Sequence, residues 1–203
     1  MNSDFMSNYP NQTGNKETKN SIFKSNSERK SLESQLKQGI MAMDPSGTST
    51  TSIFYYENWN QWKILSFTEK NWLKQAENME NWLENLRPSK VLVETGLLFR
   101  RQKYNYNMTD LIKVIGALEY TAYQRETEYI RVSNEYRKRW ANEYANKGLI
   151  KGLELRKIQG KMGAPRKVWF FKDRELNEHE KDAILVFYAW WTKKMGREWP
   201  FAE

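Results

Sequence analysis

The segment GIMAMDPSGTSTTSIFYYENWNQWKILSFTE, residues 39–69, holds the pattern that decides the fold. Its first part, Ile40 to Asp44, is apolar and stops at the turn signal Asp-Pro-Ser-Gly. Two stretches rich in β-branched and aromatic residues follow, over residues 51–56 and 61–67, with ENWN between them. Three strands in a meander are the simplest interpretation, and they predict the start of an α/β fold.

Helices and strands are then expected to alternate. Apolar residues recur at spacings of three and four over residues 69–86, which predicts a one-faced helix that ends at Arg87-Pro88. The continuous apolar run of KVLVETG, residues 90–96, is typical of a central parallel strand. Next we expect an amphipathic helix over 109–126 with Thr109 or Asp110 as its cap, a fifth strand over 127–133 and a helix over 134–146. Residues 147–174 are basic and punctuated by glycine, and no element is assigned to them.

Composition limits the classes of protein that are possible. The 203 residues suffice for one well-buried domain. Residues 1–37 are rich in Asn, Ser, Lys and Glu without a sustained apolar period, which predicts a disordered polar tail before a domain of residues 38–203. Lys and Arg total 33 against 25 Asp and Glu, and the net charge of +8 favours polyanions such as nucleic acid or acidic membrane surfaces.

The absence of cysteine excludes disulfides, zinc-thiolate sites and thiol nucleophiles, and it fits a reducing compartment. Any metal must therefore use oxygen or imidazole ligands. No stretch has the roughly 20 apolar residues that span a bilayer, so we expect a soluble protein without a membrane partner.

The segment NEHEKDAILVFYAWW, residues 177–191, contains the only histidine of the chain. Its apolar run suits a buried strand or a buried helix, but Asn177 with Glu180 three residues later resembles a capping box and favours a helix. On a helix, His179 and Asp182 are neighbours on one face and could share a metal ion. A solvated histidine in the first turn of the helix is the alternative.

Two further acids stand where predicted strands end. Asp44 is either a turn-initiating residue before proline or a metal ligand. Glu94 follows Val91-Leu92-Val93, where a carboxylate is costly to bury unless it reaches solvent at the strand end, a partner or a metal. Carboxylates that are brought together repel unless a divalent cation compensates them, and oxygen ligands with one imidazole suit Mg²⁺ or Mn²⁺.

Taken in order, these motifs resemble the RuvC-type Holliday junction resolvases, in particular their divergent phage-like members, within the RNase H-like superfamily. The resemblance implies a five-stranded mixed sheet flanked by helices. Asp44, Glu94 and Asp182 match the family's acids, and His179 stands where bacterial members often have Asp. The connection after Glu94 is longer than in the bacterial pattern, and the tail has no counterpart. The motifs that carry the resemblance are IMAMDPSGTSTTS, KVLVETG, DLIKVIGALEYTA, EYIRVSNEYRKRW and HEKDAILVFYAWW, spread over residues 39–193.

The resemblance implies a structure-selective endonuclease of DNA recombination and repair, which hydrolyses four-way or branched DNA with two Mg²⁺ or Mn²⁺ ions per active site. Asp44 would bridge the ions and Glu94 would bind one of them. Asp182 would bind the other with His179, which could instead act as a general base. The resemblance also implies a homodimer in the cytoplasm, and the Asn and Lys bias favours an AT-rich phage genome.

Two other functions remain open at this stage. One is an RNase H-like nuclease that acts on RNA–DNA hybrids or flapped DNA. The other is a non-catalytic DNA-binding module with the same fold.

Two basic segments are the predicted DNA contacts. LLFRRQKYNYN, residues 97–107, mixes aromatic and basic side chains, and the resemblance makes Phe99 the candidate for probing the junction centre. The second segment runs from Lys151 to Lys167. For both segments an ordinary solvated surface is the alternative. The predicted DNA-binding residues are Phe99, Arg100, Arg101, Lys103, Tyr104, Lys151, Arg156, Lys157 and Lys161.

Overall fold

The computed structural model describes residues 39–95, 106–132, 140–160 and 164–202 of the chain. The predicted tail of residues 1–37 lies outside these ranges. So do the predicted DNA-binding residues Phe99, Arg100, Arg101, Lys103, Tyr104 and Lys161. No helix in the described ranges has the length and apolar character needed to cross a membrane.

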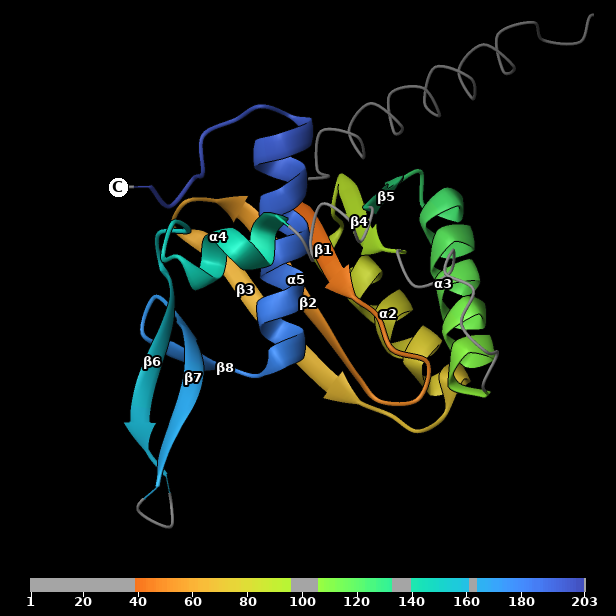
Figure 1. Ribbon diagram of the computed structural model, residues 1–203. Helices are drawn as coiled ribbons and strands as arrows, with labels where there is room; N and C mark the ends of the chain where they lie inside the picture. The colour runs from red at the N-terminus through yellow and green to blue at the C-terminus, as the bar shows by residue number, and fades with distance from the viewer. Residues whose placement is uncertain (1–38, 96–105, 133–139, 161–163, 203) are drawn as a thin grey trace, which may run out of the picture. The chain divides into compact units, whose positions relative to one another are not determined.

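A five-stranded mixed sheet lies at the centre of the fold (Figure 1). Strand β1 runs antiparallel to β2 and parallel to β4, while β2 pairs with β3 in a hairpin and β4 runs parallel to β5. The order β3-β2-β1-β4-β5 confirms the meander, the central parallel strand and the five-stranded mixed sheet of an α/β fold. The strands are β1 (Ile40–Asp44), β2 (Thr50–Asn58), β3 (Gln61–Thr68), β4 (Lys90–Glu94) and β5 (Glu128–Val132).

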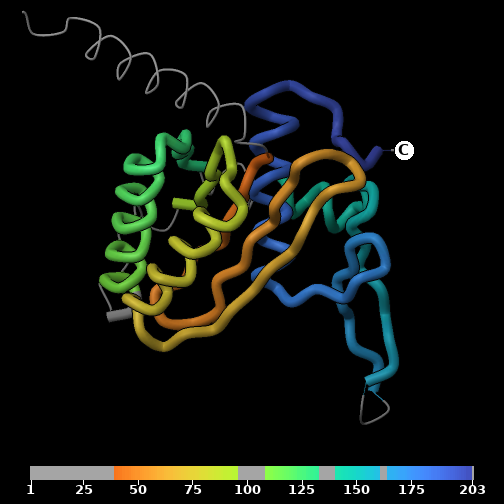
Figure 2. The backbone as a smooth tube through the Cα atoms, turned by 180° about the vertical axis from the view of Figure 1, so that it is seen from behind, coloured from red at the N-terminus to blue at the C-terminus, as the bar shows by residue number. Residues whose placement is uncertain are grey.

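Helices cover both faces of this sheet, as the view from behind also shows (Figure 2). One face packs against α2 (Trp72–Leu86) and α3 (Tyr106–Gln124), and the other packs against α5 (Glu178–Tyr188). Successive side chains of a strand point to opposite faces. Met41 and Met43 therefore join the core under α2 and α3, whereas Ala42 joins the core under α5.

The helix boundaries differ in places from those expected. Helix α3 begins at Tyr106, so the prediction that Thr109 or Asp110 caps it is wrong. Asp110 lies inside the helix, where its carboxylate accepts a hydrogen bond from Lys113 at 3.0 Å instead of binding free backbone N–H groups. Of the helix expected over residues 134–146, α4 (Asn142–Asn146) is described, and residues 133–139 lie outside the described ranges. Helix α5 continues as a π-helix, η2 (Ala189–Lys194).

A second, three-stranded antiparallel sheet stands where no element was assigned. It consists of β6 (Leu153–Gln159), β7 (Pro165–Phe171) and β8 (Arg174–Leu176). Charged side chains on both faces of the hairpin hide the apolar alternation that would have predicted strands. Strand β8 leads directly into α5 through Asn177 (Figure 1).

Phe54 of β2 joins the parts of the core on the α5 face. Its fully buried ring contacts Phe187 of α5 at a centroid distance of 5.2 Å and Phe171 of β7 at 5.7 Å. Phe201, near the end of the chain, lies 6.3 Å away in an edge-on arrangement. The position of α5 on the sheet therefore depends on an aromatic cluster that draws on four separate segments.

Replacing Phe54 with alanine is expected to lower the free energy of unfolding by about 3–5 kcal/mol, because it leaves a cavity where these segments meet. The matched control is Trp59→Ala in the β2–β3 turn, where the ring is 64% exposed and truncation should change stability by less than about 0.5 kcal/mol. Urea unfolding followed by circular dichroism measures both. Similar losses in the two variants would contradict this account of the core.

Candidate active site

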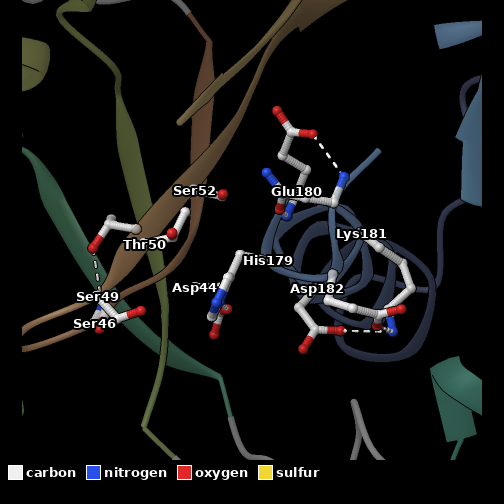
Figure 3. A network of polar contacts seen from close by, with 12 residues as sticks. Asp44, Ser46, Ser49, Thr50, Ser52, His179, Glu180, Lys181 and Asp182 are labelled. Atoms are coloured by element: carbon white, nitrogen blue, oxygen red, sulfur yellow. Dashed lines mark hydrogen bonds and ion pairs between the residues drawn. The ribbon is translucent and has the colours of Figure 1, made fainter. Parts of the chain in front are cut away.

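Asp44 and His179 meet at the carboxyl end of β1 (Figure 3). His179 lies in the first turn of α5, and its Nδ1 is 2.8 Å from Oδ2 of Asp44. The Asp44 side chain is largely buried, whereas that of His179 is 42% exposed. The structure therefore brings together two predicted site residues that are 135 positions apart in the sequence.

Glu94 ends the parallel strand next to Asp44. Met43 and Val93 are register partners, so Asp44 and Glu94 follow them at neighbouring strand ends, about 4.8 Å apart in backbone spacing. Met43 and Val93, which precede these two acids, point to the core under α2 and α3. Successive side chains of a strand point to opposite faces, so Asp44 and Glu94 point to the face that α5 covers. Glu94 is only 7% exposed, so the interpretation of it as a solvated strand end is wrong.

Asp182 lies one turn after His179 on α5 and has a different neighbour. Its Oδ1 is 3.3 Å from Nζ of Lys181, a nearly buried ammonium group that also pairs with Glu178 and lies 5.6 Å from the centre of the Trp169 ring. Figure 3 shows the Asp182 carboxylate directed toward Lys181. Within the described ranges, no three His, Asp or Glu side chains form a group that could hold a metal ion.

The start of α5 is fixed by the capping box that the sequence predicts. The Asn177 side chain accepts a hydrogen bond from the backbone N–H of Glu180 at 2.8 Å, and the Glu180 carboxylate accepts one from the backbone N–H of Asn177 at 3.0 Å. Each bond satisfies a donor that the first turn of a helix leaves free. The capping box therefore fixes the residue at which α5 begins, and with it the position of His179 in the first turn.

Glu180 also ties this turn to two strands, a role that the sequence did not reveal. Its Oε1 accepts hydrogen bonds from Arg174 of β8 at 2.7 Å and from Ser66 of β3 at 3.0 Å. Ser66 in turn bonds Ser52 of β2 at 2.8 Å, and Ser52 is the register partner of Asp44. A partly buried chain of hydrogen bonds thus links the start of α5 to the strand that flanks Asp44. The sequence shows Ser52 and Ser66 among the aromatic and β-branched residues of these strands, which by itself does not indicate this link.

A buried glutamine holds the connection that follows Asp44. Gln75 of α2 accepts a hydrogen bond from the Thr51 hydroxyl at 2.9 Å and donates to the backbone carbonyls of Ser49 and Glu69. Thr51 also accepts a hydrogen bond from the backbone N–H of Ser46 at 2.9 Å. The turn after β1 is therefore anchored from beneath the sheet, which restricts the backbone next to Asp44.

The electrostatic environment favours the charged form of His179. The hydrogen bond to Asp44 raises the pKa of His179, partial burial opposes this rise, and the charges of Asp44, Asp182 and Glu178 support it. In this arrangement the imidazolium supplies positive charge beside the Asp44 carboxylate. The donor types, carboxylate oxygen and a single imidazole, suit Mg²⁺ or Mn²⁺. Binding through Nδ1 would require His179 to lose its proton and release Asp44.

The predicted DNA-binding residues that are described do not share one environment. Arg156 is held by Glu154 at 2.8 Å and by Asp173 at 2.9 Å, and its guanidinium lies 4.7 Å from the centre of the Phe170 ring. Lys151 and Lys157 are both exposed. Arg156 is therefore paired with two acids of the second sheet and its turns, and the two lysines present their charges to solvent.

Comparisons with known proteins bear on the fold. No family model and no curated protein matches the sequence. Among solved structures, T. thermophilus RuvC in complex with Holliday junction substrate is similar over 78% of this chain and 96% of that chain, with 17% identity and a TM-score of 0.47. A second Thermus thermophilus RuvC structure gives 16% identity, coverage of 78% and 97%, and a TM-score of 0.46. The Aquifex aeolicus Ppx/GppA phosphatase gives 10% identity, coverage of 69% and 50%, and a TM-score of 0.30. At these values the likeness concerns the fold alone.

The pKa of His179 provides a direct test of the contact with Asp44. Because the chain has a single histidine, its imidazole gives one NMR titration curve in metal-free buffer. We expect a pKa above the ordinary 6.5 in the wild type and a fall toward that value in Asp44→Asn. Glu119→Gln, on the helix that covers the opposite face, should leave the curve unchanged.

The same contact predicts a pH dependence of stability. A pKa that is raised in the folded state means that the contact stabilises the fold fully below pH 6.5 and that this contribution is lost as pH rises through the folded-state pKa. The difference in free energy of unfolding between wild type and Asp44→Asn should therefore shrink over that interval. Urea unfolding at a series of pH values measures it, and a constant difference would argue against the ion pair.

Proposed function

We propose that this chain is a metal-dependent endonuclease that cuts branched DNA, with the four-way junction as its preferred substrate. The observation that carries the proposal is the contact of Asp44 with His179 beside Glu94, at one edge of the sheet. Two strand-end carboxylates and a polar helix start converge there from segments far apart in the sequence. Buried carboxylates on neighbouring strands are stable only with compensating positive charge, which a hydrolytic metal site would supply.

The charge and accessibility of the chain support a polyanionic substrate. The net charge of +8 attracts a phosphate backbone over long range. The 42% exposure of His179 leaves the edge of the site open to solvent, so a phosphate in a large molecule could reach it. A nucleic acid fits these properties better than a small neutral substrate does.

In the proposed site, Asp44, Glu94, Asp182 and His179 would hold two Mg²⁺ or Mn²⁺ ions, which would activate water and stabilise the leaving 3′ oxygen. The chain itself contributes the alignment. Asp44 and Glu94 are placed by the register of β1 and β4, so little rearrangement of their backbone is needed.

Two side chains would have to change state before the reaction. Asp182 would leave the Lys181 ammonium, which keeps Glu178 as its partner. His179 would lose one proton, after which Nε2 could bind a metal or accept a proton from the attacking water while Nδ1–H donates to Asp44, or Nδ1 could do so after releasing Asp44. The expected products carry a 5′ phosphate and a 3′ hydroxyl.

The catalytic prediction is tested with labelled four-way junction, linear duplex and RNA–DNA hybrid, each incubated in Mg²⁺, Mn²⁺ or EDTA. We expect the junction to be cut in the presence of either metal and not in EDTA. Asp44→Asn and Glu94→Gln should slow cutting by at least about 100-fold while leaving junction binding intact, because each removes a proposed metal ligand. Glu119→Gln, which removes an exposed acid on α3, should cut at the wild-type rate.

Each other result has a distinct meaning. Junction binding without cutting in either metal would reject the enzyme and leave a DNA-binding module. Preferential cutting of the hybrid would move the protein to the RNase H-like alternative. Wild-type cutting by Asp44→Asn would place the active site elsewhere.

We also propose a homodimer with twofold symmetry, because a four-way junction offers two equivalent strands to cut. Light scattering after size-exclusion chromatography should then give a mass near twice the 24.4 kDa of the chain, with one dimer bound per junction. A mass of one chain, both free and bound to the junction, would contradict the dimer without affecting the catalytic prediction.

A further inference from the structure

The hairpin of β6 and β7 carries two lysines that the proposed reaction does not use. Lys157 and Lys167 are register partners on the two antiparallel strands, and both are exposed. Opposite residues in such a pair have Cβ atoms about 4.5–5.5 Å apart and lie on the same face of the sheet. Two positive charges therefore stand side by side on one face of the hairpin.

That face is continuous with the face that packs against the rest of the fold. Trp169 and Phe171 follow Lys167 at the two-residue period of a strand, and both belong to the core beneath α5. Leu153, opposite Phe171, lies in the same core. The lysines thus occupy the part of this face that lies beyond the core. In both overall views the hairpin projects past the end at which α5 begins (Figures 1 and 2).

The arginines of the hairpin are arranged differently. Arg156 pairs with Glu154 and Asp173, and Arg166 pairs with Glu175 at 3.0 Å. Both arginines alternate with the lysines, so they lie on the opposite face.

No acidic side chain of the described ranges lies within ion-pair distance of Lys157 or Lys167. Like charges directly opposite each other destabilise a strand pair. The pairing of Lys157 with Lys167 therefore does not stabilise the hairpin, whereas an anion bound between the two ammonium groups would reduce their repulsion.

A cavity lies between Lys167 and the start of α5. It has a volume of about 440 Å³, and its lining includes Lys167, Trp169, the N-cap residue Asn177 and Glu178, the first residue of α5. Lys181, which contacts Asp182, lies over the ring of Trp169. Lys167 follows about 7 Å farther out along the strand. Lys167 therefore lies on the strand face that leads outward from Trp169 and the start of α5.

We propose that Lys157 and Lys167 bind the sugar–phosphate backbone of a DNA arm that leaves the active site along the hairpin. The identity of the polyanion rests on the proposed function, whereas the position of the binding surface rests on the hairpin alone. Ammonium groups on flexible stems bind phosphates as point charges and do not read bases. The hairpin would therefore add affinity and orientation without sequence preference.

The test compares two double variants that remove the same net charge. Lys157→Gln with Lys167→Gln removes the proposed contacts, and Lys113→Gln with Lys147→Gln, whose ammonium groups pair with Asp110 and Glu143, is the matched control. Fluorescence anisotropy with a labelled four-way junction in EDTA, over about 0.05 to 0.3 M salt, measures binding without cutting. We expect the lysine variant to bind at least about tenfold more weakly at 0.1 M salt, with the slope of log K against log salt reduced by about 2.

The control variant should bind within about threefold of the wild type and keep its salt slope, because its charges are already neutralised by acids on the protein. Thermal unfolding checks the fold, and the lysine variant should be at least as stable as the wild type since it removes a repulsion. Equal loss of affinity in the two variants would show that net charge alone matters and would overturn the proposal. Wild-type affinity and slope in the lysine variant would overturn it as well.

Failure of this inference is distinguishable from failure of the proposed function. A wild type that binds the junction but never cuts it would reject the nuclease, and the comparison of variants could still be made. A lysine variant that binds like the wild type, beside a wild type that cuts, would reject the hairpin surface alone.

Discussion

The packing of α5 across the sheet is the constraint on which the rest of the molecule depends. Every residue from Ala183 to Tyr188 is buried, and the ring of Phe187 lies against Phe54 and Tyr56 of β2. This apolar contact fixes the helix while its first turn carries four charged or polar residues in succession. The hydrophobic part of the helix thus supplies the stability, and the charged turn can be arranged for chemistry.

Much of the fold and part of the site could be predicted from the sequence because the relevant signals are local. The turn after Asp44, the apolar run before Glu94 and the capping box at Asn177 each mark the end or start of an element. Parallel pairing of β1 with β4 then places the two acids at one edge. Local signals do not specify side-chain rotamers, and the pairing of Asp182 with Lys181 could not be foreseen.

Other features depend on tertiary contacts that a periodic pattern does not contain. Leu73 fits the apolar stripe of α2 but is 52% exposed, whereas the polar Gln75 is fully buried because it satisfies the turn after β1. The second sheet was missed because charged side chains on both faces of its hairpin hide the apolar alternation, although Arg156 and Arg166 are each paired with an acid of the same sheet. The polar groups of Gln75, Arg156 and Arg166 are each stabilised by a partner that is distant in the sequence.

Only the cap residue Asn177 separates the end of β8 from the start of α5, so the number of residues at this junction is restricted. An α-helix turns by about 100° per residue, so one residue added beside Asn177 would rotate His179 away from Asp44 unless the whole helix shifted. The hydrogen bond from Arg174 of β8 to Glu180 of α5 spans this junction, so an added residue would also break that bond. Insertions and deletions should therefore be excluded at the junction of β8 with α5.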